Sequence, residues 1–206
     1  PIPVDNPTRE KVAIIVAKGT ILDGDHPPGQ VGGDSIAKLI REARNNKTIK
    51  AIVLRIDSPG GSASASELIR SELALTQESG KPVVASMGGY AASGGYWIAS
   101  TANRIFASES TITGSIGVFA LFPTIEQSLE QLGIFSDGVG TTNLSGSFSQ
   151  FRSINPIFER TLKISVEQTY NKFLGLVVEG RGMTMDEADG IAQGRVWTGT
   201  HALDNG

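Results

Sequence analysis

The sequence predicts an α/β fold built on a mostly parallel sheet, because apolar strand patterns alternate with helical ones. Val12–Ala17, Ala51–Ile56 and Pro82–Ser86 are short apolar runs, the first two rich in β-branched residues. Runs of this kind are typical of buried strands, and the unbroken run Val12–Ala17 is expected to be buried on both faces. The segments between them have helical spacing. Strand and helix therefore recur at the intervals of parallel βαβ units with right-handed crossovers.

The two connecting helices are predicted from their capping residues. Asp34 can cap a helix whose apolar residues fall at helical spacing across Ile36–Ala43. Ser64 and Glu67 form the pattern of a capping box at the start of the second helix. We therefore expect helices on the sheet between the first three strands.

The second half of the chain has weaker strand signals. Gly117–Phe122 and Ile134–Val139 are predicted strands that flank a helix starting near Thr124. The segment Thr141–Asn155 is rich in Ser, Thr and Gly and is expected to be a loop.

The last quarter of the chain is predicted to be helical. Asn155 and Pro156 begin a long amphipathic helix, and Thr184 with Glu187 forms a capping box that opens a short helix. No linker or repeat divides the sequence, so residues 1–206 are expected to form one domain. Because the sequence starts at Pro1 and lacks a signal segment, we interpret it as a piece of a longer protein.

Composition excludes several kinds of function. Hydrophobic residues make up 39% of the 206 residues and charged residues 19%, as in soluble globular proteins. The net charge of −3 gives no basic surface for nucleic acid, so no nucleic-acid partner is expected. The absence of cysteine excludes disulfides, thiolate metal sites and cysteine nucleophiles. No metal or cofactor is predicted. The uncharged stretch Pro82–Asn103 is too interrupted by glycine for a membrane-spanning helix.

Ser93 is the candidate nucleophile, within Ala91-Ala92-Ser93-Gly94-Gly95-Tyr96. A serine at a turn from strand to helix projects its hydroxyl from a tight bend, and the helix N-terminus behind it supplies backbone N–H groups. The N–H of Gly94 would then point at a developing oxyanion. The alternative is a Gly/Ser turn that only allows close packing.

Gly60 and Gly61 follow the second predicted strand, in the segment Asp57–Ser62. A Gly-Gly step can present an unobstructed N–H to the same oxyanion, which would give a hole with donors from two loops. The alternative is a turn without a further role. Both glycine clusters fall at the carboxyl ends of parallel strands, where ligands bind in sheets of this type.

A serine nucleophile needs a base, and the chain offers no convincing one. The two histidines, His26 and His201, lie far from the glycine clusters in the sequence and are expected to be surface residues. Ser35 and Lys38 have the S-x-x-K spacing of penicillin-binding enzymes, but no S-D-N or K-T-G motif follows, so we interpret this match as chance.

Together these motifs resemble the signal peptide peptidase A family of serine peptidases, whose fold is that of the Clp proteases and crotonases. The resemblance rests on four ordered segments: I-V-L-R-I-D-S-P-G-G-S at Ile52–Ser62, G-G-Y-A-A-S-G-G-Y at Gly88–Tyr96, T-G-S-I-G-V at Thr113–Val118, and G-R-V-W-T-G at Gly194–Gly199. It implies a Clp/crotonase-like fold.

The resemblance also implies the roles of the site residues. Ser93 is the nucleophile of a Ser-Lys dyad, Gly60 or Gly61 with Gly94 forms the oxyanion hole, and Ser115 orients the lysine. In single-domain relatives the lysine follows the serine by roughly fifty residues, but the matching segment here, Thr141–Gln150, has none. In the long, duplicated form of the family, the N-terminal copy supplies the lysine. The chain fits the C-terminal copy, so the fragment alone is expected to be inactive.

The implied biology is the degradation of cleaved signal peptides, by an inner-membrane-anchored protein whose catalytic part faces the periplasm. The membrane anchor would lie outside this chain, and several subunits would assemble into a homo-oligomer. Two alternatives remain: a crotonase-type acyl-CoA enzyme, which shares the two-loop oxyanion hole, and a non-catalytic scaffold domain, which the missing base favours.

Overall fold

The structure, a computed structural model, describes residues 10–206. The chain divides into two compact units, one formed by the residues up to Gly117 together with Lys172–Gly206, the other by Val118–Asn171. The expectation of a single domain stays a prediction. The elements are β1 (Lys11–Lys18), β2 (Ile21–Leu22), β3 (Val31–Gly32), α1 (Gly33–Asn45), β4 (Ile49–Ser58), α2 (Ala63–Glu78), β5 (Val83–Ala92), α3 (Gly94–Trp97), β6 (Arg104–Phe106), β7 (Ile112–Gly114), α4 (Glu126–Glu130), α5 (Pro156–Arg181), α6 (Met185–Ile191), β8 (Val196–Thr198) and α7 (Gly199–Asp204).

The first unit contains a six-stranded sheet, which confirms the predicted mostly parallel α/β fold. The strand order is β1-β4-β5-β7-β8, and β6 also pairs with β5. All of these pairings are parallel except that of β7 with β8. A separate pair, β2 and β3, is also parallel. The carboxyl ends of β4 and β5 therefore lie side by side, each continuing into one of the two glycine clusters.

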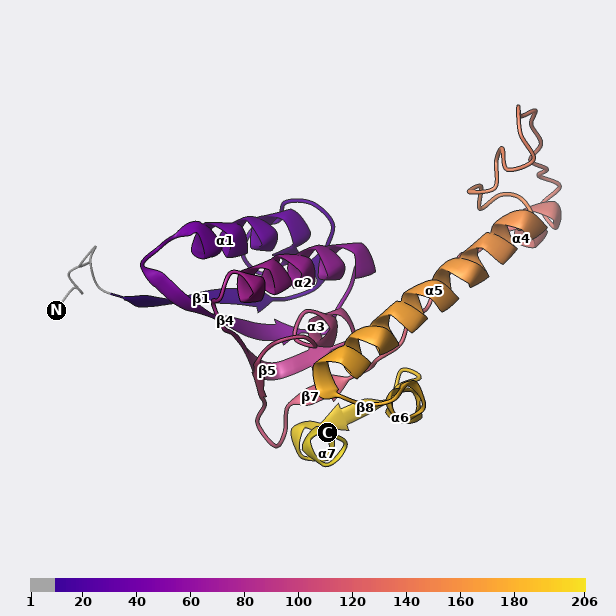
Figure 1. Cartoon of the computed structure of the whole chain (residues 1–206). Helices are drawn as coiled ribbons and strands as arrows, with labels where there is room; N and C mark the ends of the chain where they lie inside the picture. The colour runs from indigo at the N-terminus through magenta and orange to yellow at the C-terminus, as the bar shows by residue number, and fades with distance from the viewer. Residues whose placement is uncertain (1–9) are drawn as a thin grey trace. The chain divides into compact units, whose positions relative to one another are not determined.

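Helices α1, α2 and α3 cover one face of this sheet (Figure 1). The core between sheet and helices is made of aliphatic side chains that are almost fully buried. It includes Ile15, Ala17, Ile52, Leu54, Ile56, Val83, Ala85 and Met87 from the strands and Ile36, Ile40, Ile69 and Leu73 from the helices.

Strand β1 corrects one expectation. Val12, Ile14 and Val16 point to the face opposite the helices, where they remain 57%, 69% and 55% exposed. The prediction that this strand is buried on both faces is therefore wrong for the described chain. The apolar run identified the strand correctly, but β1 is an edge strand and helices cover it on one side only.

The helix caps also differ from the prediction. Helix α1 starts after Gly32 without a side-chain cap, and Asp34 lies in its first turn, where its N–H is satisfied by the Gly24 carbonyl at 3.1 Å. Helix α2 is capped by Ser62, whose Oγ accepts from the Ala65 N–H at 3.2 Å. Ser64 instead donates to Asp23 at 2.8 Å. The predicted capping box is therefore wrong, and Glu67 is free for other contacts.

The second unit, residues 118–171, contains no strand. The predicted strands at Gly117–Phe122 and Ile134–Val139 are wrong, and only the short helix α4 forms between them. Most of their apolar side chains are exposed, Phe119 and Val139 among them, and the two segments have no neighbouring strand with which to pair. The segment Thr141–Asn155 is a succession of turns and irregular structure, as predicted.

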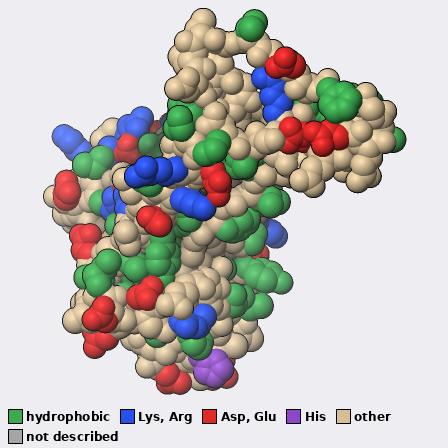
Figure 2. Space-filling model, turned by 90° about the vertical axis from the view of Figure 1, so that its right-hand side faces the viewer, with side chains coloured by type: hydrophobic (Ala, Val, Ile, Leu, Met, Phe, Trp, Pro, Cys, Tyr) green, Lys and Arg blue, Asp and Glu red, His purple; other side chains and the backbone are tan. Residues whose placement is uncertain are grey.

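The C-terminal helices agree with the sequence. Helix α5 begins at Pro156, with the Asn155 side chain accepting from the Ile157 N–H at 2.8 Å. The capping box of Thr184 and Glu187 at the start of α6 is confirmed, with both reciprocal hydrogen bonds present. Within residues 10–206, no helix has the length and apolar character needed to cross a membrane. On the face shown in Figure 2, basic and acidic side chains are interspersed.

The one-sided core predicts a contrast between two substitutions in the sheet. Leu54→Ala, at a side chain that is fully buried in β4, should lower the free energy of unfolding by about 2–5 kcal/mol. Ile14→Ala, on the uncovered face of β1, should change it by less than about 1 kcal/mol. Urea unfolding of the 206-residue chain measures both. A loss at Ile14 as large as that at Leu54 would show that the outer face is covered in solution.

Candidate active site

Ser93 lies at the bend where β5 ends and α3 begins. Its backbone has φ 53° and ψ −122°, a conformation that costs a non-glycine residue about 1–3 kcal/mol. Hydrogen bonds hold the bend on both sides. The Ser93 N–H donates to the Gly114 carbonyl of β7 at 2.9 Å, and the Ser93 carbonyl accepts from the N–H groups of Tyr96 and Trp97, both at 2.9 Å. This is the geometry that projects a serine hydroxyl from the edge of a sheet.

The Gly60-Gly61 turn lies against this bend. A Cβ placed on Gly60 would come within 2.7 Å of the Gly94 nitrogen and 2.8 Å of the Ser93 Cβ. A Cβ on Gly94 would come within 3.2 Å of the Gly61 nitrogen. Gly60 and Gly61 also have φ values of 103° and 149°, which L-residues rarely adopt. Glycine is therefore required here by both space and conformation, and the structure brings the two predicted glycine clusters together.

The backbone donors of the two loops are not equivalent. The Gly60 N–H donates to the Ser58 hydroxyl at 3.2 Å. Gly61 bridges to Ile21 through hydrogen bonds of its neighbours, from the Ile21 N–H to the Gly60 carbonyl and from the Ser62 N–H to the Ile21 carbonyl. Across residues 10–206 no acceptor is found for the N–H of Gly61 or Gly94. Gly61 and Gly94 are therefore the pair available to an oxyanion.

Ser115 lies beside Ser93. Ala92 of β5 pairs with Gly114 of β7, so the two serines that follow these residues are neighbours across the strands. Ser115 also has a positive φ of 49°, and its N–H donates to the Arg195 carbonyl at 2.7 Å. Neither serine hydroxyl has a hydrogen-bond partner among the described residues. Ser93 and Ser115 therefore lie next to each other at the same edge of the sheet.

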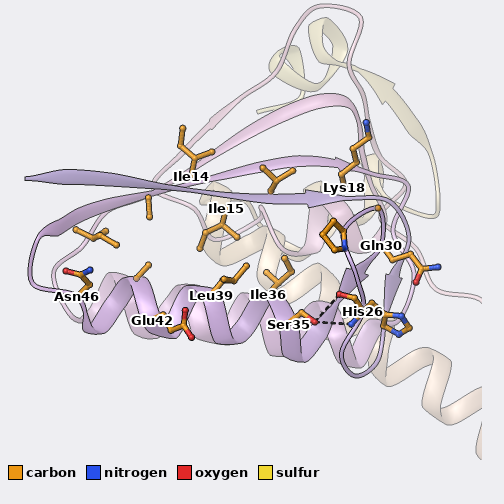
Figure 3. Close-up of a pocket in the computed structure, with 16 residues that line it drawn as sticks. Ile14, Ile15, Lys18, His26, Gln30, Ser35, Ile36, Leu39, Glu42 and Asn46 are labelled. Carbon is orange, nitrogen blue, oxygen red and sulfur yellow. Dashed lines mark hydrogen bonds between the residues drawn. The ribbon is translucent and has the colours of Figure 1, made fainter. Parts of the chain in front are cut away.

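The two histidines have contacts elsewhere. His26 lines a groove of about 750 Å³ between β1 and α1, shown in Figure 3, and its Nε2 lies 3.1 Å from the Asp23 carbonyl. The Ser35 hydroxyl in the same groove accepts from the His26 N–H at 2.9 Å (Figure 3). It also donates to Asp25 at 3.1 Å. Ser35 therefore fastens a loop, which agrees with the interpretation of its S-x-x-K match as chance. His201 lies in the last helix, α7, and packs against Trp197 of β8, with ring centroids 6.4 Å apart.

No lysine of the described chain contacts Ser93. Burial and the nearby charge of Lys50 lower the pKa of Lys81, as a lysine base would require. Its amine, however, donates to three carbonyls at the end of α1, those of Ala43, Arg44 and Asn46. Lys81 precedes β5 and Ser93 follows it, so the ten-residue strand separates them by roughly 30 Å. Lys81 is therefore excluded as the base.

A partly buried polar cluster next to the site was missed by the sequence reasoning. The Glu67 carboxylate of α2 accepts from the Trp97 indole at 2.9 Å, from Arg70 at 2.9 and 3.0 Å, and lies 3.1 Å from the Lys172 amine. Burial by itself would raise the pKa of Glu67, but hydrogen bonds from Arg70, Trp97 and Lys172 outweigh it and lower the pKa to about 2. The only feature of the sequence that could have indicated this cluster is the i, i+3 spacing of Glu67 and Arg70, which is typical of an ion pair on a helix.

Within residues 10–206 no group of three or more His, Asp or Glu side chains is arranged to hold a metal ion. The predicted site residues that the structure brings together are thus Ser93, Gly94, Gly60, Gly61 and Ser115. All lie at the carboxyl ends of β4, β5 and β7 in the first unit.

A strained serine at a strand-to-helix bend, beside two free glycine N–H groups, is the arrangement of a serine hydrolase. Comparison with known families agrees: the profile of peptidase family S49 matches residues 76–206, and the chain belongs to this family. The chain is 51% identical to Protease 4 of Salmonella typhi over 97% of its length and 46% identical to Protease 4 of Haemophilus influenzae over 95%. It is 37% identical, over 96% of its length, to the chloroplastic serine protease SPPA of Arabidopsis thaliana. The chain spans about a third of the length of these relatives, 32%, 32% and 30% respectively.

The ion pairs of Glu67 predict how its contribution to stability changes with pH. Its pKa of about 2 in the folded chain lies below the usual value of 4.5, so ionised Glu67 stabilises the fold above about pH 4.5. That contribution is lost as the pH falls from about 4.5 toward 2, because the unfolded chain takes up the proton first. The difference in unfolding free energy between wild type and Glu67→Gln should therefore be constant near neutral pH and shrink below pH 4.5. Denaturant unfolding across this range measures it, and a difference independent of pH would contradict the assigned contacts.

Proposed function

We propose that this chain carries the nucleophile of a serine endopeptidase with a Ser-Lys dyad, and that Ser93 is that nucleophile. The observation that supports this most directly is the bend at Ser93, held in a strained conformation beside the free N–H groups of Gly61 and Gly94. A packing turn has no need of a strained serine or of unpaired amides. Membership in peptidase family S49 supports the same chemistry.

The reaction would proceed by acyl transfer. A neutral lysine takes the proton of the Ser93 hydroxyl as the oxygen attacks the peptide carbonyl, and the resulting oxyanion accepts from Gly61 and Gly94. The lysine then returns the proton to the leaving amine, so that an ester to Ser93 remains. Water, deprotonated by the same lysine, then attacks this ester, and the lysine gives that proton to the departing Ser93 oxygen, which frees the acid product. Ser115, next to Ser93, would orient the lysine amine toward the Ser93 hydroxyl. Because the Ser115 side chain is uncharged, it would do so without favouring the protonated form of the lysine.

We propose that the lysine comes from another part of the same protein. The segment Thr141–Gln150 has none, and Lys81, the lysine with a lowered pKa, is held at the far end of β5. The relatives named above are about three times as long as this chain, which leaves room for a second copy of the fold. The N-terminal half of the protein is therefore the proposed partner of Ser93.

The proposed substrates are signal peptides that have already been cleaved from their proteins, and this rests on the family resemblance. The same resemblance underlies three further proposals: an anchor in the inner membrane outside this chain, a catalytic part that faces the periplasm, and assembly into a homo-oligomer. Family membership disfavours the acyl-CoA alternative. The scaffold alternative predicts an unreactive Ser93 and is decided by the experiments below.

Replacing the nucleophile should abolish activity. In the full-length protein, Ser93→Ala should lower kcat for peptide cleavage by several orders of magnitude, because the covalent step is lost, while far-UV circular dichroism and the melting temperature stay unchanged. A fluorophosphonate probe should label the wild type and not the variant. Activity within about tenfold of wild type, or equal labelling of both, would reject Ser93 as the nucleophile and favour a scaffold.

The isolated chain should fold but not cleave peptides. The described residues contain a complete core under the sheet, whereas no base lies next to Ser93. Adding the separately expressed N-terminal half should restore part of the activity if its lysine reaches hydrogen-bond distance, about 2.6–3.2 Å, of Ser93. Peptide cleavage by the purified 206-residue chain, with Ser93→Ala as control, is the measurement. Turnover by the chain alone that depends on Ser93 would mean that the base comes from these residues or from an identical subunit.

A further inference from the structure

We propose that Glu67 is a positioning residue for Ser93, which it holds in place through Trp97. This inference rests on the proposed function, since it assigns Glu67 a part in the reaction of Ser93. Glu67 lies on α2, in the second turn after the Ser62 cap. One of its contacts is to Trp97 of α3, the helix that begins directly after Ser93.

The link from Glu67 to Ser93 has two hydrogen bonds. The Glu67 carboxylate accepts from the Trp97 indole N–H at 2.9 Å. The backbone N–H of Trp97 in turn donates to the Ser93 carbonyl, also at 2.9 Å. Helix α3 has only four residues, so Trp97 is both its last residue and a direct partner of Ser93. The Glu67 carboxylate on α2 thus binds the last residue of α3, and Ser93, the proposed nucleophile, directly precedes the first residue of that helix.

Helix α3 needs such an anchor because it is too short to be stable alone. An isolated helix of four residues has no net stability in water, and the strain at Ser93 opposes the bend from which the helix starts. Trp97 is 2% exposed and packs on Phe173 of α5, with ring centroids 4.6 Å apart. Its indole N–H would be an unsatisfied donor without Glu67, and a buried unpaired donor destabilises its surroundings.

Glu67 itself is fixed in direction by cations. Arg70 binds both of its oxygens, and Lys172 of α5 lies 3.1 Å from Oε1, so the oxygen that accepts from Trp97 cannot turn away. The side chains of Glu67 and Arg70 are only 23% and 15% exposed. Three elements, α2, α3 and α5, therefore meet at one carboxylate, and α2 begins directly after the Gly60-Gly61 turn. The cluster sets the distance between the turn that carries the Gly61 N–H and the bend that carries Ser93.

Helix α2 offers a matched control. Glu72 is another glutamate of the same helix; it is buried and pairs with Arg41 at 2.5 Å and Arg44 at 2.6 Å. Both arginines belong to α1, and Glu72 has no contact with α3 among its described bonds. Its loss should destabilise the fold as the loss of Glu67 does, without moving Ser93.

The experiment compares Glu67→Ala, Trp97→Phe and Glu72→Ala in the full-length protein, well below the melting temperature of every variant. Trp97→Phe removes the donor and retains an aromatic ring against Phe173.

We expect Glu67→Ala and Trp97→Phe to lower kcat by about 10- to 100-fold with little change in KM, the scale reached when a reacting group is displaced by up to about 1 Å. The double variant should be no slower than the slower single variant, because both substitutions break one link. Glu72→Ala should lower the melting temperature and leave kcat at the wild-type value. Glu67→Gln, which keeps an acceptor for Trp97, should recover part of the rate.

The outcomes separate this inference from the proposed function. If Ser93→Ala is inactive while Glu67→Ala and Trp97→Phe keep the kcat of Glu72→Ala, Glu67 only stabilises the fold and the inference is rejected. If Ser93→Ala itself remains active, the proposed function has failed and the inference falls with it. Should Glu67→Ala fail to fold, Trp97→Phe decides alone: wild-type kcat rejects the inference, and a reduced kcat with unchanged KM supports it.

Discussion

The backbone conformation of Ser93 is the constraint on which the site depends. A serine with φ 53° does not persist unless its surroundings hold it, and here they do so from three directions. The Gly114 carbonyl of β7 fixes its N–H, the first turn of α3 fixes its carbonyl, and the Gly60-Gly61 turn lies in van der Waals contact behind it. The parallel pairing of β4, β5 and β7 brings all three together, so the sheet is the means by which the strain is maintained.

The same constraint explains the placement of the glycines. A side chain at Gly60 would collide with Ser93 and with the nitrogen of Gly94, and one at Gly95 would come within 2.6 Å of the Ser58 carbonyl at the end of β4. Close approach of the two loops leaves the N–H groups of Gly61 and Gly94 next to each other. An oxyanion hole made of two loops therefore requires small residues in both, and the donors are positioned before any substrate arrives.

Polar groups at the two ends of the sheet have separate tasks. At the amino end of β5, Lys81 caps the carbonyls that end α1, which stabilises the helix and removes the amine from any part in catalysis. At the carboxyl end, the carboxylate of Glu67 on α2 contacts Trp97 of α3 and Lys172 of α5. The Glu67 carboxylate is partly buried, and its contacts with Arg70, Lys172, Trp97 and Ser71 compensate for the hydration that it loses.

Much of the architecture could be predicted from the sequence, because it depends on local patterns. Apolar runs indicated β1, β4 and β5, and the Thr184–Glu187 pair indicated the cap of α6. Glycine clusters after two of the strands indicated where the candidate site lies. Four ordered motifs were enough to indicate the family. Only the tertiary structure decided which of Gly60 and Gly61 has a free N–H, that Val12, Ile14 and Val16 lie on an uncovered face, and that Glu67 meets Trp97 rather than capping its own helix. Those outcomes depend on which segments become neighbours in space, and the spacing of residues along the chain does not record that.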